Sequence, residues 1–153
     1  MKTLLLSLLL VCGFVAHGAE QKKTVWLYNF EDAQAQAKKE GKHVLIYFTG
    51  SDWSQICINY KRDVLTGLDF TKYARRNLIL VEADFPNKGA QSPALRKSNE
   101  ALKEKFHVSG LPVIVVLNKE GVEVWRQNGA PEGGVRPLLA ALTTAVGDKP
   151  NEK

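Results

Sequence analysis

Short apolar runs alternate with amphipathic stretches along most of this chain. Two nearly continuous apolar runs, 43–48 and 78–83, have the length of strands buried on both faces of a sheet. A short first strand is predicted over 25–27. Two further strands, over 113–117 and 122–126, are joined by a hairpin signal, Asn118 to Gly121. Helix-type patterns cover 30–40, 54–64, 70–75, 93–106 and 135–146. This order predicts an α/β fold, with a central mixed β-sheet sandwiched by helices.

The first eighteen residues have the pattern of a signal peptide. Lys2 is followed by the apolar stretch 4–15 and then by Ala16-His17-Gly18, a small-x-small cleavage signal, with cleavage after Ala19 as the near alternative. An uncleaved anchor is less compatible with so short an apolar stretch, and a lipoprotein through Cys12 lacks a small residue before the cysteine. We therefore expect a signal peptide over 1–18, a domain over 19–146, a flexible polar tail over 147–153, no membrane span after processing, and a periplasmic or secreted protein.

Charge and cysteine content exclude several classes of function. The formal net charge is +5, and basic residues are interleaved with acids, without the basic and aromatic stripe of a nucleic-acid-binding protein. Removal of the signal peptide would leave Cys57 as the single cysteine, so no intramolecular disulfide could form. The remaining histidines and cysteine have no metal-ligand spacing. We expect no metal, no cofactor and no nucleic-acid partner.

The segment Trp53-Ser54-Gln55-Ile56-Cys57 directly follows the predicted buried strand 43–48. Together with Gly50 to Trp53, Leu80 to Pro86 and Val108 to Pro112, it resembles exported bacterial proteins of the thioredoxin family, over about 26–145. The resemblance implies the thioredoxin-like fold, a cis proline at Pro112, and Trp-Cys-x-x-Cys as the usual motif. Here Ser54 replaces the nucleophilic cysteine, and strand 43–48 lacks the buried acid of many thioredoxins.

Two interpretations remain open for each residue of the motif. Ser54 is expected at a helix N-terminus, where serine is a favoured cap; the functional alternative is that it tunes the Cys57 thiol or binds a partner. Cys57 lies one turn further on, where the helix end favours a thiolate and apolar burial opposes it. We expect burial to dominate, and a reactive monothiol is the alternative.

The resemblance also implies an apolar surface formed by Trp53, Ile56, Leu111 and Pro112. In the family this surface receives an extended peptide beside the cis proline, a form of strand addition that needs no thiol. The structural alternative is that Trp53 merely packs over the start of the helix.

The first functional hypothesis is therefore an extracytoplasmic module that has lost the dithiol centre and binds a protein or peptide partner in the cell envelope, in a chaperone-like way. On this hypothesis the protein is not a competent dithiol–disulfide oxidoreductase. The second hypothesis is a monothiol exchange protein that uses Cys57, and the third is a scaffold subunit of an envelope complex. The sequence leaves the partner and the oligomeric state open.

Overall fold

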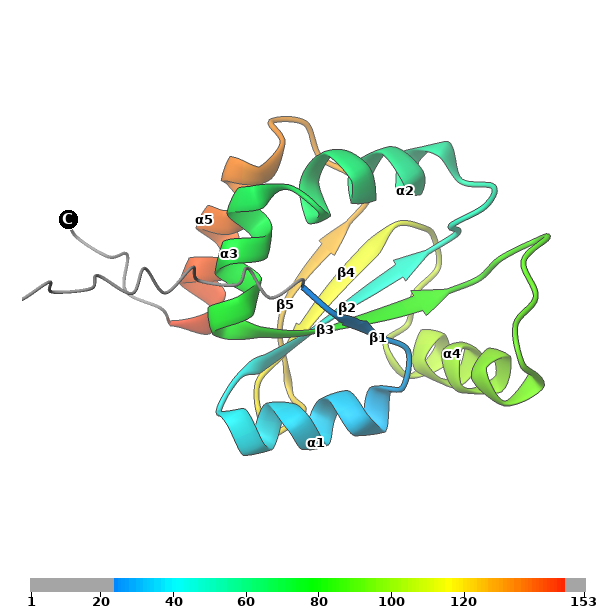
Figure 1. Ribbon diagram of the computed structural model, residues 1–153, viewed down its shortest axis with the longest axis horizontal. Coiled ribbons are helices and arrows are strands. Elements are labelled where there is room, and N and C mark those ends of the chain that lie inside the picture. The colour runs from blue at the N-terminus through cyan, green and yellow to red at the C-terminus, as the bar shows by residue number, and fades with distance from the viewer. Residues whose placement is uncertain (1–23, 148–153) are drawn as a thin grey trace, which may run out of the picture.

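The computed structural model describes residues 24–147, which contain one mixed sheet with helices on both faces (Figure 1). The predicted signal peptide and the tail from residue 148 lie outside the described residues. The strand order is β1-β3-β2-β4-β5. The strands are β1 (Trp26–Leu27), β2 (His43–Thr49), β3 (Leu78–Asp84), β4 (Val113–Leu117) and β5 (Glu123–Asn128). The predicted mixed α/β sandwich is confirmed.

The strand directions follow from the connections. β1 and β2 both pair with β3 in parallel, and each of these strands is followed by a helix that crosses over the sheet. β4 pairs antiparallel with β2, and the hairpin at Asn118 returns the chain antiparallel as β5. The Asn118 side chain accepts hydrogen bonds from the backbone N–H groups of Glu120 and Val122, which fixes this turn.

Helices cover the two faces of the sheet unequally. In Figure 1, α1 and α4 lie below the sheet, and α2, α3 and α5 lie above it. The helices are α1 (Phe30–Glu40), α2 (Gln55–Tyr60), the π-helical turn η1 (Lys61–Leu65), α3 (Leu68–Asn77), α4 (Pro93–Lys105) and α5 (Val135–Val146). The predicted helix over 54–64 is thus shorter, because its second half widens into the π-helical turn.

Side chains of the central strands alternate between two cores, as the period of a strand requires. On β2, Val44, Ile46 and Phe48 pack below with α1 and α4, whereas Leu45 and Tyr47 pack above with α2, α3 and α5. β3 alternates in the same way along its length. Because both faces are covered, β2 shows the continuous apolar run from which it was predicted.

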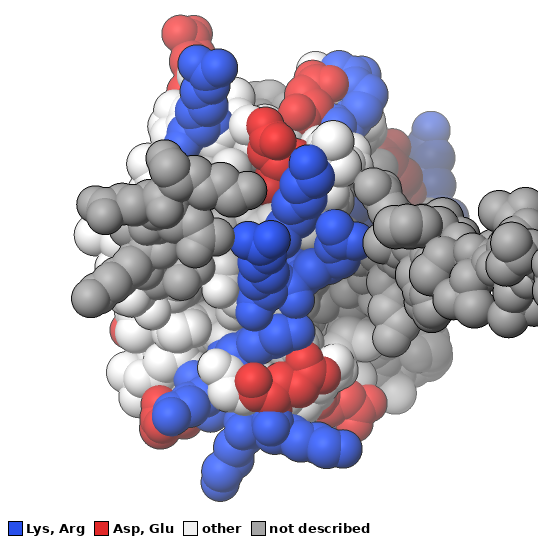
Figure 2. Space-filling model, turned by 60° about the vertical axis from the view of Figure 1, so that its left-hand side comes forward, with Lys and Arg blue, Asp and Glu red and all other residues white. Residues whose placement is uncertain are grey.

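One face of the molecule gathers basic side chains that the sequence spreads out. Figure 2 turns the left-hand side of Figure 1 forward and shows Lys and Arg in a column down the middle of that face. Helix α3, on this side of the molecule, carries Lys72, Arg75 and Arg76. Among residues 24–147, no helix has the length and apolar character needed to cross a membrane.

Candidate functional site

The motif lies at the edge of the sheet where β2 and β3 end and β4 begins (Figure 1). Parallel strands bring their carboxyl ends to one edge, so the loop after Thr49, the loop after Asp84 and the segment before Val113 meet there. The peptide bond between Leu111 and Pro112 is cis, as predicted.

Ser54 is the N-cap of α2. Its backbone is extended, and its hydroxyl oxygen accepts a hydrogen bond from the N–H of Cys57 at 3.4 Å. This is the capping role that the sequence predicts for a serine at this position. The hydroxyl therefore touches the backbone of Cys57, one helical turn further on.

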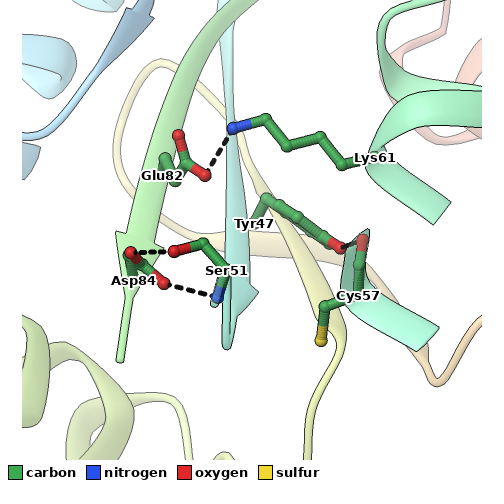
Figure 3. A network of polar contacts seen from close by, with 6 residues as sticks. All are labelled: Tyr47, Ser51, Cys57, Lys61, Glu82 and Asp84. Atoms are coloured by element: carbon green, nitrogen blue, oxygen red, sulfur yellow. Dashed lines mark hydrogen bonds and ion pairs between the residues drawn. The ribbon is translucent and has the colours of Figure 1, made fainter. Parts of the chain in front are cut away.

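Cys57 is completely buried, with 0% of its surface exposed. Its carbonyl oxygen accepts a hydrogen bond from the Tyr47 hydroxyl at 2.9 Å, and Figure 3 shows its sulfur turned away from that bond. Burial raises the pKa of Tyr47, so its hydroxyl stays a proton donor. The expected burial of Cys57 is found.

A partly buried ion pair lies behind α2. Lys61, the first residue of η1, reaches across to the carboxylate of Glu82 on β3, as Figure 3 shows. Glu82 is only 4% exposed, and the Lys61 ammonium group also lies 5.3 Å from the centre of the Trp26 ring. Because an unpaired carboxylate would be very costly at this depth, Lys61 is the group that allows Glu82 to be buried.

Trp53 is half exposed and folds back over the loop before it. Its ring nitrogen donates a hydrogen bond to the carbonyl of Phe85 at 2.8 Å, and half of its surface remains accessible. A Cβ atom at Gly50 would lie 2.5 Å from the ring, so a glycine is needed beneath it. The ring thus packs over the loop, as in the structural alternative, and still presents an apolar surface.

Two aspartates fix the loops around Trp53. Asp52 accepts hydrogen bonds from the backbone N–H groups of Asn87, Lys88 and Gly89, which lower its pKa. Asp84 accepts from both the N–H and the hydroxyl of Ser51, as drawn in Figure 3. The motif loop and the loop after β3 are thereby held together.

Trp53 and Leu111 line one cleft of about 490 Å³, whose far wall is formed by α4. Among the described residues, neither the N–H nor the C=O of Leu111 has a hydrogen-bond partner. Pro112 lies buried beneath, and its carbonyl accepts from Gly129. Ile56 is 60% exposed at the start of α2 but does not line this cleft. The structure thus brings Trp53 and Leu111 together and leaves Ile56 to one side.

The polar residues behind and beside the motif were missed by the sequence interpretation. Glu82 interrupts the apolar run 78–83, which is a usable signal of a buried charge. Its partner Lys61 lies 21 residues away, a pairing that no local pattern shows. The described residues contain no group of three or more His, Cys, Asp or Glu side chains placed to hold a metal ion.

Comparison with known proteins places this arrangement in a family. A sequence profile described as the thioredoxin-like domain matches residues 30–136, and the chain belongs to this family. It is 34% identical over 106 residues to the disulfide bond reductase DsbH of Chlamydia pneumoniae, covering 69% of this chain and 64% of that protein. It is 32% identical over 124 residues to the thioredoxin-related protein DsbJ of the same organism, covering 81% of this chain and 36% of that one. The chain thus spans less than two thirds of either relative.

Solved structures support the same fold. A structure described as DsbH oxidoreductase superposes with a TM-score of 0.77 at 30% identity, covering 83% of this chain and 87% of that one. A thioredoxin from Thermus thermophilus superposes with a TM-score of 0.60 at 19% identity, covering 79% and 86%, and shows the fold alone. The predicted thioredoxin-like fold and family are confirmed.

Proposed function

We propose that this protein binds an extended segment of another protein at the cleft beside Trp53 and Leu111, without a dithiol redox cycle. The observation that carries the proposal is the unpaired backbone of Leu111 next to an exposed aromatic ring. A partner strand can satisfy the Leu111 N–H and C=O while its side chains contact Trp53. The cis Pro112 is buried and sets the direction of the backbone at Leu111, and Ile56 offers a further exposed apolar side chain beside the cleft.

The residues at the two ends of the motif, Ser54 and Cys57, support the proposed loss of dithiol chemistry. A dithiol cycle needs two sulfurs that close a disulfide after one of them has attacked. Here Ser54 supplies an oxygen that caps α2, and Cys57 has no exposed surface. The site therefore offers a surface for binding and no thiol that an incoming disulfide can reach in this conformation.

The proposed setting is extracytoplasmic. The N-terminal pattern supports a signal peptide over 1–18, followed by a domain over 19–146 and a polar tail over 147–153. One relative is named a disulfide bond reductase, and disulfides persist in oxidising compartments outside the cytoplasm. The partner would then be a protein of the cell envelope.

A second candidate function is monothiol exchange through Cys57. The names of the DsbH relatives, a reductase and an oxidoreductase, favour it. Cys57 also lines a surface hollow of about 400 Å³ on the side of Lys61. In such a reaction the Cys57 thiolate would attack a substrate disulfide and release one substrate thiolate, and an external thiol would then free Cys57 from the mixed disulfide. This route requires local opening of α2.

The binding proposal can be tested with reduced, carboxymethylated α-lactalbumin, an unfolded probe that has no free thiol. We expect the natural protein to bind it, and Trp53→Ala to weaken binding about tenfold or more, since buried aromatic anchors dominate such contacts. Leu68→Ala is the matched control, because Leu68 is 56% exposed at the start of α3 and does not line the cleft. Cys57→Ala should bind like the natural protein.

Either of two results would contradict the proposal: binding that Trp53→Ala and Leu68→Ala reduce equally, or no binding by the natural protein. Binding that needs the Cys57 thiol and a disulfide-bearing probe would favour monothiol exchange instead.

A further inference from the structure

The cleft beside Trp53 does not end at the loop but continues along α4. Its far wall includes Arg96, Glu100 and Lys103. These positions are four and three residues apart, so they form one stripe along the helix. A second hollow of about 480 Å³ shares Arg96 and Glu100 with the cleft and adds Lys97.

On this wall the cationic side chains outnumber the acidic ones, and most of them have no partner among the described residues. Three cations, Arg96, Lys97 and Lys103, line the two hollows together with one carboxylate, Glu100. Within the described part of the chain, the side chains of Arg96, Lys97 and Glu100 make no hydrogen bond or ion pair. Lys103 lies 5.2 Å from the centre of the Phe85 ring, at the boundary between the apolar and basic parts of the cleft.

The wall is also fixed in place. Gln91, which precedes α4, and Asn99, in its middle, both donate hydrogen bonds to the carbonyl of Asp84, which holds α4 against the end of β3. Asp52 holds the intervening loop through its three backbone contacts. The helix that carries the cations is therefore held opposite Trp53 and Leu111.

We infer that the bound segment carries an acidic side chain, which lies against Arg96 and Lys103 while the neighbouring backbone pairs with Leu111. This inference rests on the proposed function and specifies its partner. A carboxylate would pair with the Arg96 guanidinium and the Lys103 ammonium group. Because these cations and Lys97 outnumber the one carboxylate, Glu100, a basic side chain would be repelled. Since a strand advances about 3.3 Å per residue, an acid a few residues from the paired position can reach α4.

The test is a selection from a phage-displayed library of random peptides on the purified full-length protein. The natural protein should enrich peptides with Asp or Glu at a set distance from an apolar residue. Arg96→Glu/Lys103→Glu should lose that preference and bind the selected acidic peptide about tenfold more weakly, because both attractive pairs become repulsive. If this variant does not fold, Arg96→Gln/Lys103→Gln serves, with a smaller loss of about threefold.

The control is Lys72→Glu/Arg76→Glu, which makes an equal change of charge on α3 at two exposed positions outside the cleft. It should keep the acidic preference. Trp53-dependent selection without acidic enrichment, acidic enrichment that survives reversal at Arg96 and Lys103, or an equal loss in the α3 control would each overturn the inference and leave the proposed function standing. Failure of the natural protein to select any peptide, or selection unchanged by Trp53→Ala, would overturn the proposed function and this inference with it.

Discussion

The two sides of α2 differ sharply in what they expose. On the outer side, Ile56 is largely exposed and Trp53 half exposed beside the cleft. On the inner side, Cys57 is fully buried, and its carbonyl accepts a hydrogen bond from Tyr47. Lys61 pairs there with the buried Glu82 (Figure 3). The residues suited to binding thus face solvent, while those suited to thiol chemistry are packed into the fold.

This difference separates binding from stability. The outer side chains keep half or more of their surface in solvent, so their removal should lower affinity and should reduce the free energy of unfolding less than removal of the inner ones. Inner residues are the partners of buried polar groups. Removing such a residue leaves a buried group without a partner and lowers the free energy of unfolding of the whole domain. The predictions below test this separation.

The largest effect is expected from Lys61→Ala. It leaves the Glu82 carboxylate buried without its cation, and we expect a loss of about 3 kcal/mol in the free energy of unfolding, measured by urea denaturation. Binding of the carboxymethylated probe by the molecules that remain folded should be unchanged.

The double variant Lys61→Met/Glu82→Leu is the control. It removes both charges with side chains of similar size and should recover most of the lost stability, because no unpaired charge remains. A loss below about 0.5 kcal/mol for Lys61→Ala would show that Glu82 does not depend on Lys61.

Ser54→Cys tests whether a second thiol at the N-terminus of α2 restores dithiol chemistry with Cys57. It places a thiol at the N-terminus of α2, three residues before Cys57, where the helix end stabilises a thiolate and the two sulfurs can approach. We expect the variant to form an internal disulfide and to gain reductase turnover on a model disulfide, at least tenfold above the natural protein. The gain should be partial, because Gln55 and Ile56 replace the usual residues between the cysteines.

Turnover by the natural protein equal to that of Ser54→Cys would contradict the assignment of a lost dithiol centre. A folded variant that forms no disulfide would show that positions 54 and 57 are not arranged as described.

A smaller and local effect is expected from Asp52→Asn, which weakens the support of the loop 86–89. The lowered pKa of Asp52 means that its carboxylate stabilises the fold above the ordinary aspartate pKa of about 4, and that this contribution is lost as pH falls through the lower folded value. Amide hydrogen exchange at residues 87–89 should therefore be faster in the variant at neutral pH. Unchanged exchange there would contradict the role given to Asp52.

Much of the fold could be predicted because its signals are local. Each of these signals lies within the segment that it predicts. They are the apolar runs of β2 and β3, the left-handed Gly41 that ends α1, and the turn at Asn118. The first strand was predicted one residue too long, since Val25 is largely exposed. The π-helical turn η1 was not predicted, because its buried residues, Val64 and Leu65, fit the pattern of a continuing α-helix equally well.

Only the backbone features of the site at Ser54 and Pro112 could be predicted. The cap at Ser54 depends on residues within one helical turn, and the cis bond at Pro112 was predicted from the resemblance to the thioredoxin family. The ion pair joins Lys61 and Glu82, which are far apart in sequence, and the position of α4 opposite Trp53 depends on how the helix packs on the sheet. Such pairings have no local pattern and require the fold itself.

The account depends most directly on whether the Cys57 thiol is inaccessible to reagents in the native protein. Its reaction rate with a small thiol reagent can be measured across a series of urea concentrations below the unfolding transition. The account predicts a slow rate at zero urea that rises with denaturant, because the sulfur reacts only after α2 opens. A fast rate that does not depend on urea and equals that of the unfolded chain would contradict it, and would make Cys57 an accessible monothiol.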